Sequence, residues 1–249
     1  MAESPQVALI TGAAKRIGAS IAKHLHNEGF NIIIHYGSAK KDADNLVETL
    51  NTIRHSSAVA LQADLCDISQ VNQLAKTALT QWGSLSLLVN NASSFYPTPL
   101  GTITQDDWTS LVGSNVKGPL FLSQALAPAL QATSGNIINM IDMHIDRPLM
   151  NHSVYSLAKT ALASLTRSLA TELAPNVRVN GVAPGAILWP ERALTDSEKD
   201  LLLSSIPLGS MGTADDIAQA VCFLNTARYI TGQTIYVDGG RSLHTNAPA

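Results

Sequence analysis

The sequence predicts a single α/β domain spanning residues 1–249, with a doubly wound parallel sheet of seven strands. Short apolar segments alternate with segments of helical periodicity along the whole chain, which is typical of this fold class. Apolar residues make up 45% of the 249 residues but aromatic residues only 5%, so small and branched aliphatic side chains must form the core, as in parallel strands covered by helices. No internal repeat, low-complexity tract or linker divides the chain.

The expected strands are short apolar runs that stop at turn-forming or polar residues. In chain order they are Val7–Thr11, Asn31–His35, Ala58–Leu61, Leu87–Val89, Asn136–Ile141, Val177–Val182 and Thr234–Val237. The expected helices, which have apolar residues three and four positions apart, are Ile17–Glu28, Asp42–Arg54, Ile68–Trp82, Asp106–Gln131, Val154–Leu173 and Asp215–Leu224. Residues 187–212 are rich in turn-forming and charged residues, and such a segment is predicted to be a flap over the substrate.

Composition excludes several classes of protein. The chain has 16 basic and 19 acidic residues and a net charge of −3, so it lacks the basic excess of a general nucleic-acid binder. It has no signal pattern at Met1–Gln6 and no apolar stretch of about 18 residues, so we expect no membrane span and a cytoplasmic location. Cys66 and Cys222 are far apart, and Asp142 and His144 have no third ligand at a suitable spacing. We therefore expect reduced thiols and no metal site.

A glycine-containing turn joins the first expected strand to the first expected helix. It reads Thr-Gly-Ala-Ala-Lys-Arg-Ile-Gly over residues 11–18. Such a turn directs backbone N–H groups and the helix N-terminus toward a pyrophosphate, with Gly12 allowing the tight turn and Gly18 allowing close helix packing. The middle glycine of the dinucleotide-binding motif is missing, so an ordinary strand-to-helix turn is the alternative. A dinucleotide bound here would make the sheet Rossmann-type.

The residues after the second expected strand bear on the choice of cofactor. Residues 35–41 read His-Tyr-Gly-Ser-Ala-Lys-Lys and contain no acid that would accept a hydrogen bond from a ribose 2′-hydroxyl. Neutral donors and cations, with Arg16 in the glycine turn, favour the 2′-phosphate of NADP(H). The alternative for Lys40 and Lys41 is that they form a solvated start of a helix.

Tyr155 and Lys159 are four residues apart on an expected helix and therefore share one face. An ammonium beside a phenol favours the phenolate, so we expect Lys159 to lower the pKa of Tyr155. Tyr155 would then donate or accept a proton near neutral pH, and Lys159 could also hold the ribose of the nicotinamide.

These features resemble the short-chain dehydrogenase/reductase family over essentially the whole chain. The matching pieces are residues 11–18, Asp64, Asn90-Asn91-Ala92, Asn115, Tyr155 with Lys159, Pro184-Gly185 and Val237-Asp238-Gly239-Gly240. Within the family, Arg16, His35-Tyr36, residues 91–100 and Asp142 resemble the pteridine reductases. Most of the family carries serine thirteen residues before the tyrosine, whereas this chain and the pteridine reductases carry aspartate.

The resemblance implies a set of site residues. Asp142 and Tyr155 would form a proton-delivery pair, Lys159 would tune Tyr155, and Asn115 would complete the proton path through a water. Phe95 would stack on a pterin, Ser93 would hydrogen-bond it, and Arg16 would bridge cofactor phosphates and substrate. Together with the glycine turn, the resemblance implies cofactor contacts for Gly12, Arg16, Ile17, Gly18, His35, Tyr36, Ser38, Asp64, Leu65, Asn91, Ala92, Lys159, Pro184, Gly185 and Ile187.

The function predicted is that of an NADPH-dependent pteridine reductase that converts dihydropterins to tetrahydropterins, with biopterin, monapterin or dihydrofolate as the substrate. A 3-oxoacyl thioester reductase of the same family is the first alternative, against which Asp142 and residues 93–99 argue. A non-catalytic dinucleotide-binding sensor is the second, against which the set of Asn115, Tyr155 and Lys159 argues. The chain departs from the pattern at Gly37-Ser38 and at residues 188–201, so Ser38 is the expected 2′-phosphate contact and side-chain specificity is expected in the second segment. The family also implies a homotetramer formed through the helix at Val154–Leu173.

Overall fold

The computed structural model describes residues 6–189 and 194–243, and it is built on one sheet of seven parallel strands. Their bounds are β1 Val7–Ile10, β2 Asn31–Tyr36, β3 Ala58–Gln62, β4 Leu87–Asn90, β5 Asn136–Met140, β6 Arg178–Pro184 and β7 Thr234–Val237. The strand order is β3-β2-β1-β4-β5-β6-β7. The predicted fold class is confirmed, and each predicted strand is present to within two residues at either end.

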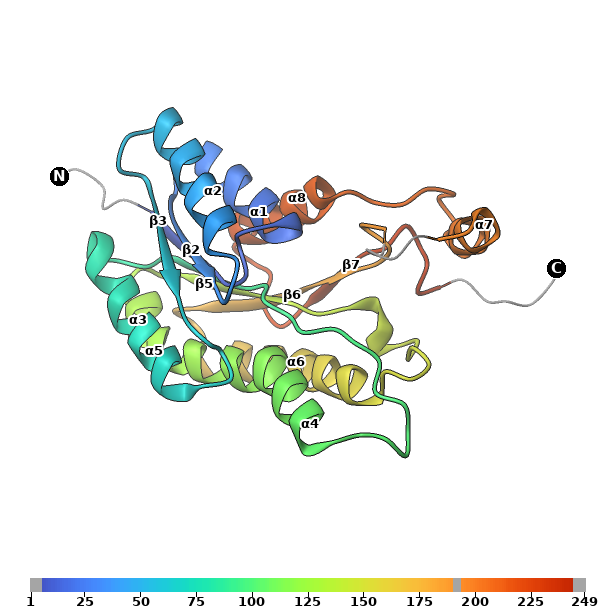
Figure 1. The fold of residues 1–249 in the computed structure, drawn as a ribbon. Coiled ribbons are helices and arrows are strands. Elements are labelled where there is room, and N and C mark those ends of the chain that lie inside the picture. Colours follow the sequence, from blue (N-terminus) through green and yellow to red (C-terminus); the bar gives the residue numbers. More distant parts are fainter. Residues whose placement is uncertain (1–5, 190–193, 244–249) are drawn as a thin grey trace.

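Helices cover both faces of the sheet (Figure 1). Their bounds are α1 Arg16–Asn27, α2 Lys40–Ile53, α3 Ile68–Trp82, α4 Gln105–Val112, α5 Gly118–Ala132, α6 Ser153–Glu172, α7 Asp196–Ser204 and α8 Ala214–Thr226. One face of the sheet is covered by α1, α2 and α8, and the other by α3, α5 and α6. Neighbouring residues of one strand enter different cores, because Ile10 packs toward α1 and α8 whereas Leu9 packs toward α3 and α5. Both faces are buried, which explains why the strands are continuously apolar.

The strand order reverses at β1, which lies between β2 and β4. Ile10 of β1 is in register with Ile34 of β2 and Val89 of β4, so the carboxyl ends of these three strands lie at one edge. Crossover helices leave this point toward opposite faces, which opens a crevice at the strand ends. The glycine turn after β1 and the polar residues after β2, β3 and β4 therefore converge on the place where a dinucleotide binds in folds of this kind.

The predicted helix at residues 106–131 is interrupted. The structure has α4, then a five-residue π-helical segment at Gly113–Lys117, then α5. Pro119 explains the break, because proline lacks the N–H that a continuous helix needs four residues after Asn115. The carbonyl of Leu111 accepts a hydrogen bond from the side-chain amide of Asn115 at 2.9 Å. A signal for this break was thus visible in the sequence at Pro119.

The segment expected to be irregular contains a helix. Thr195 caps α7 and forms a capping box with Glu198, and Leu201 to Leu203 follow within the helix. Polar residues such as Thr195 and Glu198 are typical of turns, but here they cap the N-terminus of a helix. The remainder of the predicted flap includes residues 190–193, which lie outside the described residues.

Candidate active site

The glycine turn is held against the end of β4. Gly12 has a φ of +61°, and a Cβ at this position would lie 2.9 Å from Cα of Ala92. Asn91 donates from Nδ2 to the carbonyls of Thr11 and Gly12 at 2.9 and 3.1 Å, and the Thr11 hydroxyl accepts from the N–H groups of Asn91 and Ala92. A Cβ on Gly18 would lie 2.5 Å from the Gly12 carbonyl oxygen, so both predicted glycines are required by close approach.

His35 positions the turn from the β2 side. Its Nδ1 accepts from the N–H of Gly12 at 3.1 Å, and its Nε2 lies 3.0 Å from the carbonyl of Ala63. These contacts fix a neutral ring with the proton on Nε2. Burial lowers the pKa of His35 to about 4. His35 therefore joins the glycine turn to the end of β3, which is a positioning role that the sequence did not reveal.

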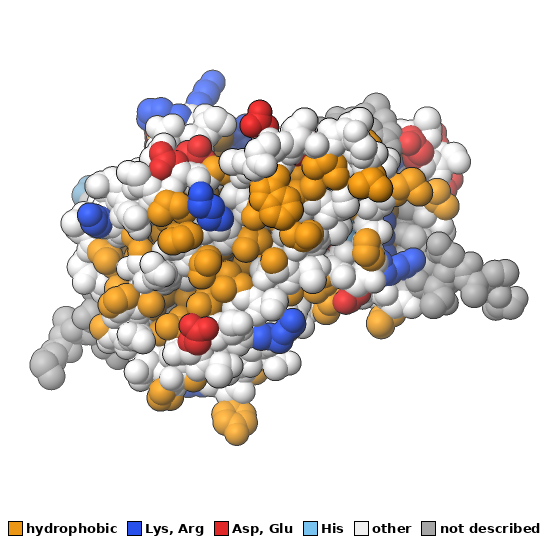
Figure 2. Space-filling model, turned by 90° about the horizontal axis from the view of Figure 1, so that it is seen from below, with side chains coloured by type: hydrophobic (Ala, Val, Ile, Leu, Met, Phe, Trp, Pro, Cys, Tyr) orange, Lys and Arg blue, Asp and Glu red, His pale blue; other side chains and the backbone are white. Residues whose placement is uncertain are grey.

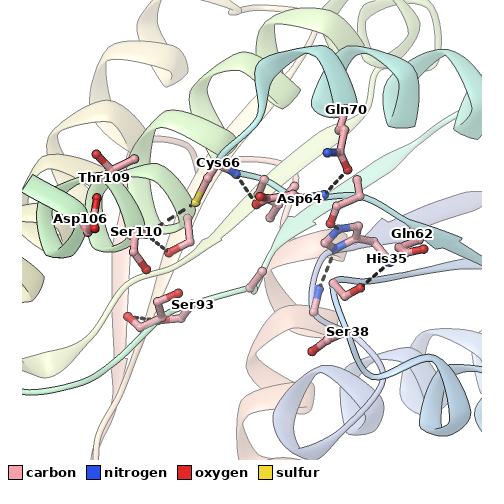
Figure 3. A pocket seen from close by; sticks show the side chains of 17 residues that line it. His35, Ser38, Gln62, Asp64, Cys66, Gln70, Ser93, Asp106, Thr109 and Ser110 are labelled. Atoms are coloured by element: carbon pink, nitrogen blue, oxygen red, sulfur yellow. Dashed lines mark hydrogen bonds between the residues drawn. The ribbon is translucent and has the colours of Figure 1, made fainter.

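A cleft of about 770 Å³ opens at the ends of β2, β3 and β4 (Figure 3). Predicted cofactor residues that line it are Gly12, His35, Ser38, Asp64, Leu65 and Ala92. Asp64 accepts from the N–H of Cys66 at 2.9 Å, and Gln62 donates from Nε2 to the carbonyl of Gly37 at 3.0 Å. These contacts order the cleft on both sides, and Ser38 lines the same side as His35 in Figure 3.

The charges around Ser38 are partly paired within the protein. Lys40 forms an ion pair with Asp44 at 2.7 Å one turn along α2, and Lys15 pairs with Asp42 at 3.0 Å. For Lys40, this geometry favours the solvated helix start over a phosphate contact. No acidic side chain occurs between residues 35 and 41, as the sequence shows.

A second cleft of about 410 Å³ lies next to the first, and Ser93 lines both. It brings together predicted residues from five separate parts of the chain. They are Arg16, Ile17, Asn91, Ser93, Phe95, Asp142, Tyr155, Lys159, Pro184, Gly185 and Ile187. Residues up to 171 positions apart in the sequence therefore meet, as the predicted site requires.

Asp142 and Tyr155 are directly hydrogen-bonded in this second cleft. The Tyr155 hydroxyl donates to Oδ2 of Asp142 at 2.6 Å, and the other carboxylate oxygen accepts from the N–H of His144 at 2.8 Å. Tyr155 is 4% exposed, so the pair is largely shielded from solvent. The two oxygens of Asp142 thus have separate partners, one from the backbone and one from the phenol.

Lys159 is buried below the pair. Its Nζ donates to the carbonyl of Met140 at 2.8 Å and lies 5.8 Å from the centre of the Tyr155 ring. Burial lowers the pKa of Lys159 to about 8, against the opposing effect of Asp142. The ammonium has three donors, and the described residues provide one acceptor for them.

The expected effect of Lys159 on Tyr155 is wrong for the structure described. The pKa of Tyr155 is raised, first by burial and then by the charge and hydrogen bond of Asp142. The spacing of four residues does place Lys159 on the same side of α6. However, Asp142 is much closer to the hydroxyl than Lys159 is to the ring, and the carboxylate effect dominates.

Asn115 orders the loop that carries the expected stacking residue. Its carboxamide accepts from the Ser93 hydroxyl at 2.8 Å and donates to the Ser94 carbonyl at 3.0 Å. Phe95 follows this loop and is 54% exposed, with its ring stacked on His152 at 4.7 Å and edge-on to Tyr155 at 4.8 Å. Asn115 thus supports the cleft through Ser93 and Ser94, and none of its hydrogen bonds within the described residues goes to Tyr155 or Lys159.

A family model described as enoyl-(acyl carrier protein) reductase matches residues 12–242. The chain belongs to the short-chain dehydrogenase/reductase family. It is 39% identical to pteridine reductase 1 of Leishmania tarentolae, over 95% of this chain and 96% of that protein. It is 38% identical to a 3-oxoacyl-(acyl-carrier-protein) reductase of Staphylococcus aureus, over 94% and 96% of the two chains. The protein is therefore an oxidoreductase of this family, and the two similarities do not separate a pterin from an acyl thioester substrate.

Some predicted residues of this short-chain dehydrogenase/reductase lie outside the two clefts. Gly18 packs closely on the Gly12 carbonyl and Asn115 hydrogen-bonds Ser93, whereas Tyr36 is buried at the end of β2. Other residues that line the clefts were missed, and they include Gln62, Gln70, His144, Leu149, Leu202 and Arg241. Gln62 is the last residue of β3 and Arg241 follows β7, so topology alone could have indicated both. Nothing in the spacing of Leu149 or Leu202 marks them.

The structure also bears on metal binding and on membrane-spanning helices. In residues 6–189 and 194–243, no group of three His, Cys, Asp or Glu side chains is placed to hold a metal ion. Over the same ranges, no helix is long and apolar enough to cross a membrane.

Proposed function

We propose that this protein is an NADPH-dependent pteridine reductase that converts dihydropterins of the biopterin or monapterin type to their tetrahydro forms, with dihydrofolate as a further candidate substrate. The observation that carries the proposal is the 2.6 Å hydrogen bond between Tyr155 and Asp142. A serine hydroxyl suits a ketone oxygen, whereas a carboxyl group suits a ring with amine and ring-nitrogen groups. Reduction of a C=N bond adds hydride to carbon and a proton to nitrogen, and this pair holds a proton next to the cleft.

The donors left by the protein fit a nicotinamide dinucleotide. Lys159 donates a hydrogen bond to the carbonyl of Met140 with one of its three N–H groups, and a ribose diol would accept hydrogen bonds from the other two. At the other end, Ser38 offers a hydroxyl to a 2′-phosphate, in a segment (residues 35–41) that contains no acidic side chain. NADPH, when bound, supplies the hydride.

Tyr155 is the group proposed to deliver the proton. Burial and the neighbouring carboxylate raise the pKa of Tyr155, so the phenol keeps its proton at neutral pH. Loss of that proton next to Asp142 would put two negative charges together, and the ammonium of Lys159 would offset them. Asp142 would orient the hydroxyl, and a proton taken from solvent would restore the phenol after each transfer. The proposed water path through Asn115 would take a proton from solvent to the pair.

The walls of the second cleft fit a flat heterocycle. Phe95 presents an exposed aromatic ring, and the hydroxyl of Ser93 lies on the same loop. Arg16 lies at the start of α1 and lines the cleft, as required of a residue that bridges phosphate and substrate. Residues 187–212, including α7, would act as the flap, since Leu188 and Leu202 of this segment line the cleft.

We also propose that the protein forms a homotetramer. The face seen in Figure 2, below the sheet in Figure 1, shows hydrophobic side chains gathered across its middle. Trp108 of α4 and Leu157 of α6 are 44% and 50% exposed. Association through these helices would bury such residues, and light scattering of the purified protein measures its mass directly.

A 3-oxoacyl thioester reductase is the second candidate, because a relative of that name is nearly as similar. One experiment separates the two. NADPH oxidation is followed with dihydrobiopterin, dihydromonapterin, dihydrofolate and an acetoacetyl thioester at equal concentrations. We expect turnover with at least one of the dihydropterins. Turnover of the thioester alone would contradict the proposed function.

A further inference from the structure

The second cleft contains a cationic side chain that the proposed proton transfer does not use. Arg241 follows the Gly239-Gly240 turn after β7 and lines the cleft with Asp142 and Tyr155. Its N–H donates to the carbonyl of Asp238 at 3.1 Å, and its own carbonyl accepts from Arg147 at 2.8 Å. The backbone at Arg241 is thus fixed on both sides.

The guanidinium of Arg241 is fixed at one atom and open at the others. Its Nε donates to the hydroxyl of Ser205, just after α7, at 3.1 Å. Among the described residues, none accepts a hydrogen bond from Nη1 or Nη2 of Arg241. An arginine held through Nε keeps the two Nη atoms together as a fork, which is the geometry that binds a carboxylate with two parallel hydrogen bonds.

The two nearby carboxylates are already occupied. Asp142 is bonded to Tyr155 and to the N–H of His144, and Asp238 accepts from the N–H groups of Gly240 and Ser242. Burial, and then the charge of Arg147, lower the pKa of Arg241. The half-buried guanidinium therefore lies beside a second cation without a hydrogen-bonded anion, and an anion that enters the cleft would relieve both effects.

The apolar residues that line the cleft around Arg241 indicate what the uncharged part of the ligand is like. Leu149, Leu188 and Leu202 line it, and Phe95 presents its ring to the same space. A ligand that fills this cleft has a flat or apolar body and a negatively charged end. A neutral polyol side chain would leave Nη1 and Nη2 of Arg241 without an anion.

We propose that Arg241 is a specificity-determining residue that binds a carboxylate on the side chain of the substrate, so that the enzyme prefers carboxylate-bearing dihydropterins to dihydropterins with neutral side chains. This inference rests on the proposed function, because the reacting ring must lie next to Asp142 and Tyr155. The other role open to Arg241 is to position Asp142 by charge alone, and the two roles differ in what they change. A carboxylate contact affects the KM of charged substrates, whereas an effect through Asp142 alters kcat for every substrate.

The test compares 7,8-dihydrofolate, which carries carboxylates, with 7,8-dihydrobiopterin, which carries none. Arg241→Gln should raise the KM for dihydrofolate at least tenfold, leave its kcat within twofold, and leave both constants for dihydrobiopterin unchanged. Arg241→Lys should recover part of the loss, because it restores the charge without the fork. Arg228→Gln is the matched control, since it removes the same charge at the opposite edge of the sheet, beside Arg178.

A second variant, Ser205→Ala, tests the same contact if Arg241→Gln does not fold. Ser205→Ala keeps the charge of Arg241 but removes the acceptor that aims it, so the KM for dihydrofolate should rise about two- to fivefold. The KM of the wild-type enzyme for dihydrofolate should also rise with salt concentration, whereas that for dihydrobiopterin should not. Equal losses with both substrates, or a fall in kcat with a shifted pH profile, would overturn the inference in favour of an effect through Asp142.

Binding measurements distinguish failure of this inference from failure of the proposed function. Calorimetry with NADP⁺-saturated protein gives the Kd of each compound without turnover. A wild-type protein that binds and reduces dihydrobiopterin at least as well as dihydrofolate overturns the inference alone. A wild-type protein that binds and reduces neither compound overturns both. Selective loss of dihydrofolate binding in Arg241→Gln supports the inference.

Discussion

The hydroxyl of Tyr155 lies 2.6 Å from Oδ2 of Asp142, and the two residues reach this contact from α6 and from the loop after β5. The contact joins a proton donor to a carboxylate whose other oxygen is fixed by the backbone at His144. Neither side chain can rotate without breaking a hydrogen bond. The direction of the phenol, and so the place at which its proton is delivered, is set before a substrate binds.

Replacement of Asp142 should separate catalysis from cofactor binding. Asp142→Ser removes the carboxylate that orients Tyr155, so kcat for a dihydropterin should fall about 100-fold, within the usual contribution of a positioned acid–base group. The Kd for NADPH, measured by fluorescence titration, should change less than threefold. Glu48→Ser, which removes an exposed carboxylate on α2, is the control. A dihydropterin turnover at the wild-type rate would mean that the proton pair is wrongly assigned.

Lys159→Met should change how stability depends on pH. The folded-state pKa of Lys159 is lowered to about 8 from 10.5, so below pH 8 both folded and unfolded chains carry the proton. Between pH 8 and 10.5 the unfolded chain binds more protons, and this group makes the wild type more stable as pH rises, by on the order of 3 kcal/mol. The variant should lack this rise. Urea unfolding of the two proteins across this range measures the difference.

Lys23→Met provides the comparison for that experiment, because Lys23 is exposed on α1. It should keep the rise in stability that the wild type shows. The NADPH affinity of Lys159→Met should fall as well, because the proposed ribose donors are lost. Identical pH dependence in the wild type and Lys159→Met would show that the buried ammonium is not the source.

His35→Leu should loosen the glycine turn. The N–H of Gly12 would lose its acceptor, which costs about 1–3 kcal/mol for a buried donor and should weaken NADPH binding about tenfold. The wild-type chain should lose stability as pH falls from 6.5 to about 4, because the unfolded histidine takes up a proton that the folded one excludes. The variant should lack that part of the acid sensitivity. His55→Leu, at an exposed position, should retain it.

Ser38→Asp should shift cofactor preference toward NADH. A carboxylate at this position would repel a 2′-phosphate and accept a hydrogen bond from a 2′-hydroxyl. The ratio of kcat/KM for NADPH to that for NADH should fall at least tenfold. Ser38→Ala removes the hydroxyl without adding charge and should weaken NADPH use only slightly. An unchanged ratio in Ser38→Asp would place the 2′-phosphate contact elsewhere.

The parts of the molecule set by local patterns were predictable from the sequence. The apolar run around Ile33 predicts a strand buried on both faces, and Gly12 predicts the turn that follows β1. The meeting of Asp142 with Tyr155 was anticipated only by resemblance to a family. Periodicity places each residue on its element but does not measure the space between elements.

The features that were missed depend on distances through space. The rise in the pKa of Tyr155 follows from burial and then from the approach of Asp142, whereas the sequence showed only the helical neighbour Lys159. The neutral ring of His35 depends on contacts with Gly12 and Ala63, which follow two other strands, β1 and β3. The unused donors of Arg241 become visible only when the chain after β7 is placed in one cleft with Asp142 and beside Ser205. Such facts have no counterpart in a single stretch of sequence.

The π-helical segment at Gly113–Lys117 makes the helix less regular and places Asn115 where it supports the cleft. It inserts an extra residue into one helical turn. In this position the side chain of Asn115 donates a hydrogen bond to the carbonyl of Leu111 and accepts one from the hydroxyl of Ser93. Deletion of one residue here would straighten the helix and turn Asn115 by about 100° away from the loop. Mutation toward a smoother and more stable helix would therefore disorder the wall on which Phe95 is mounted.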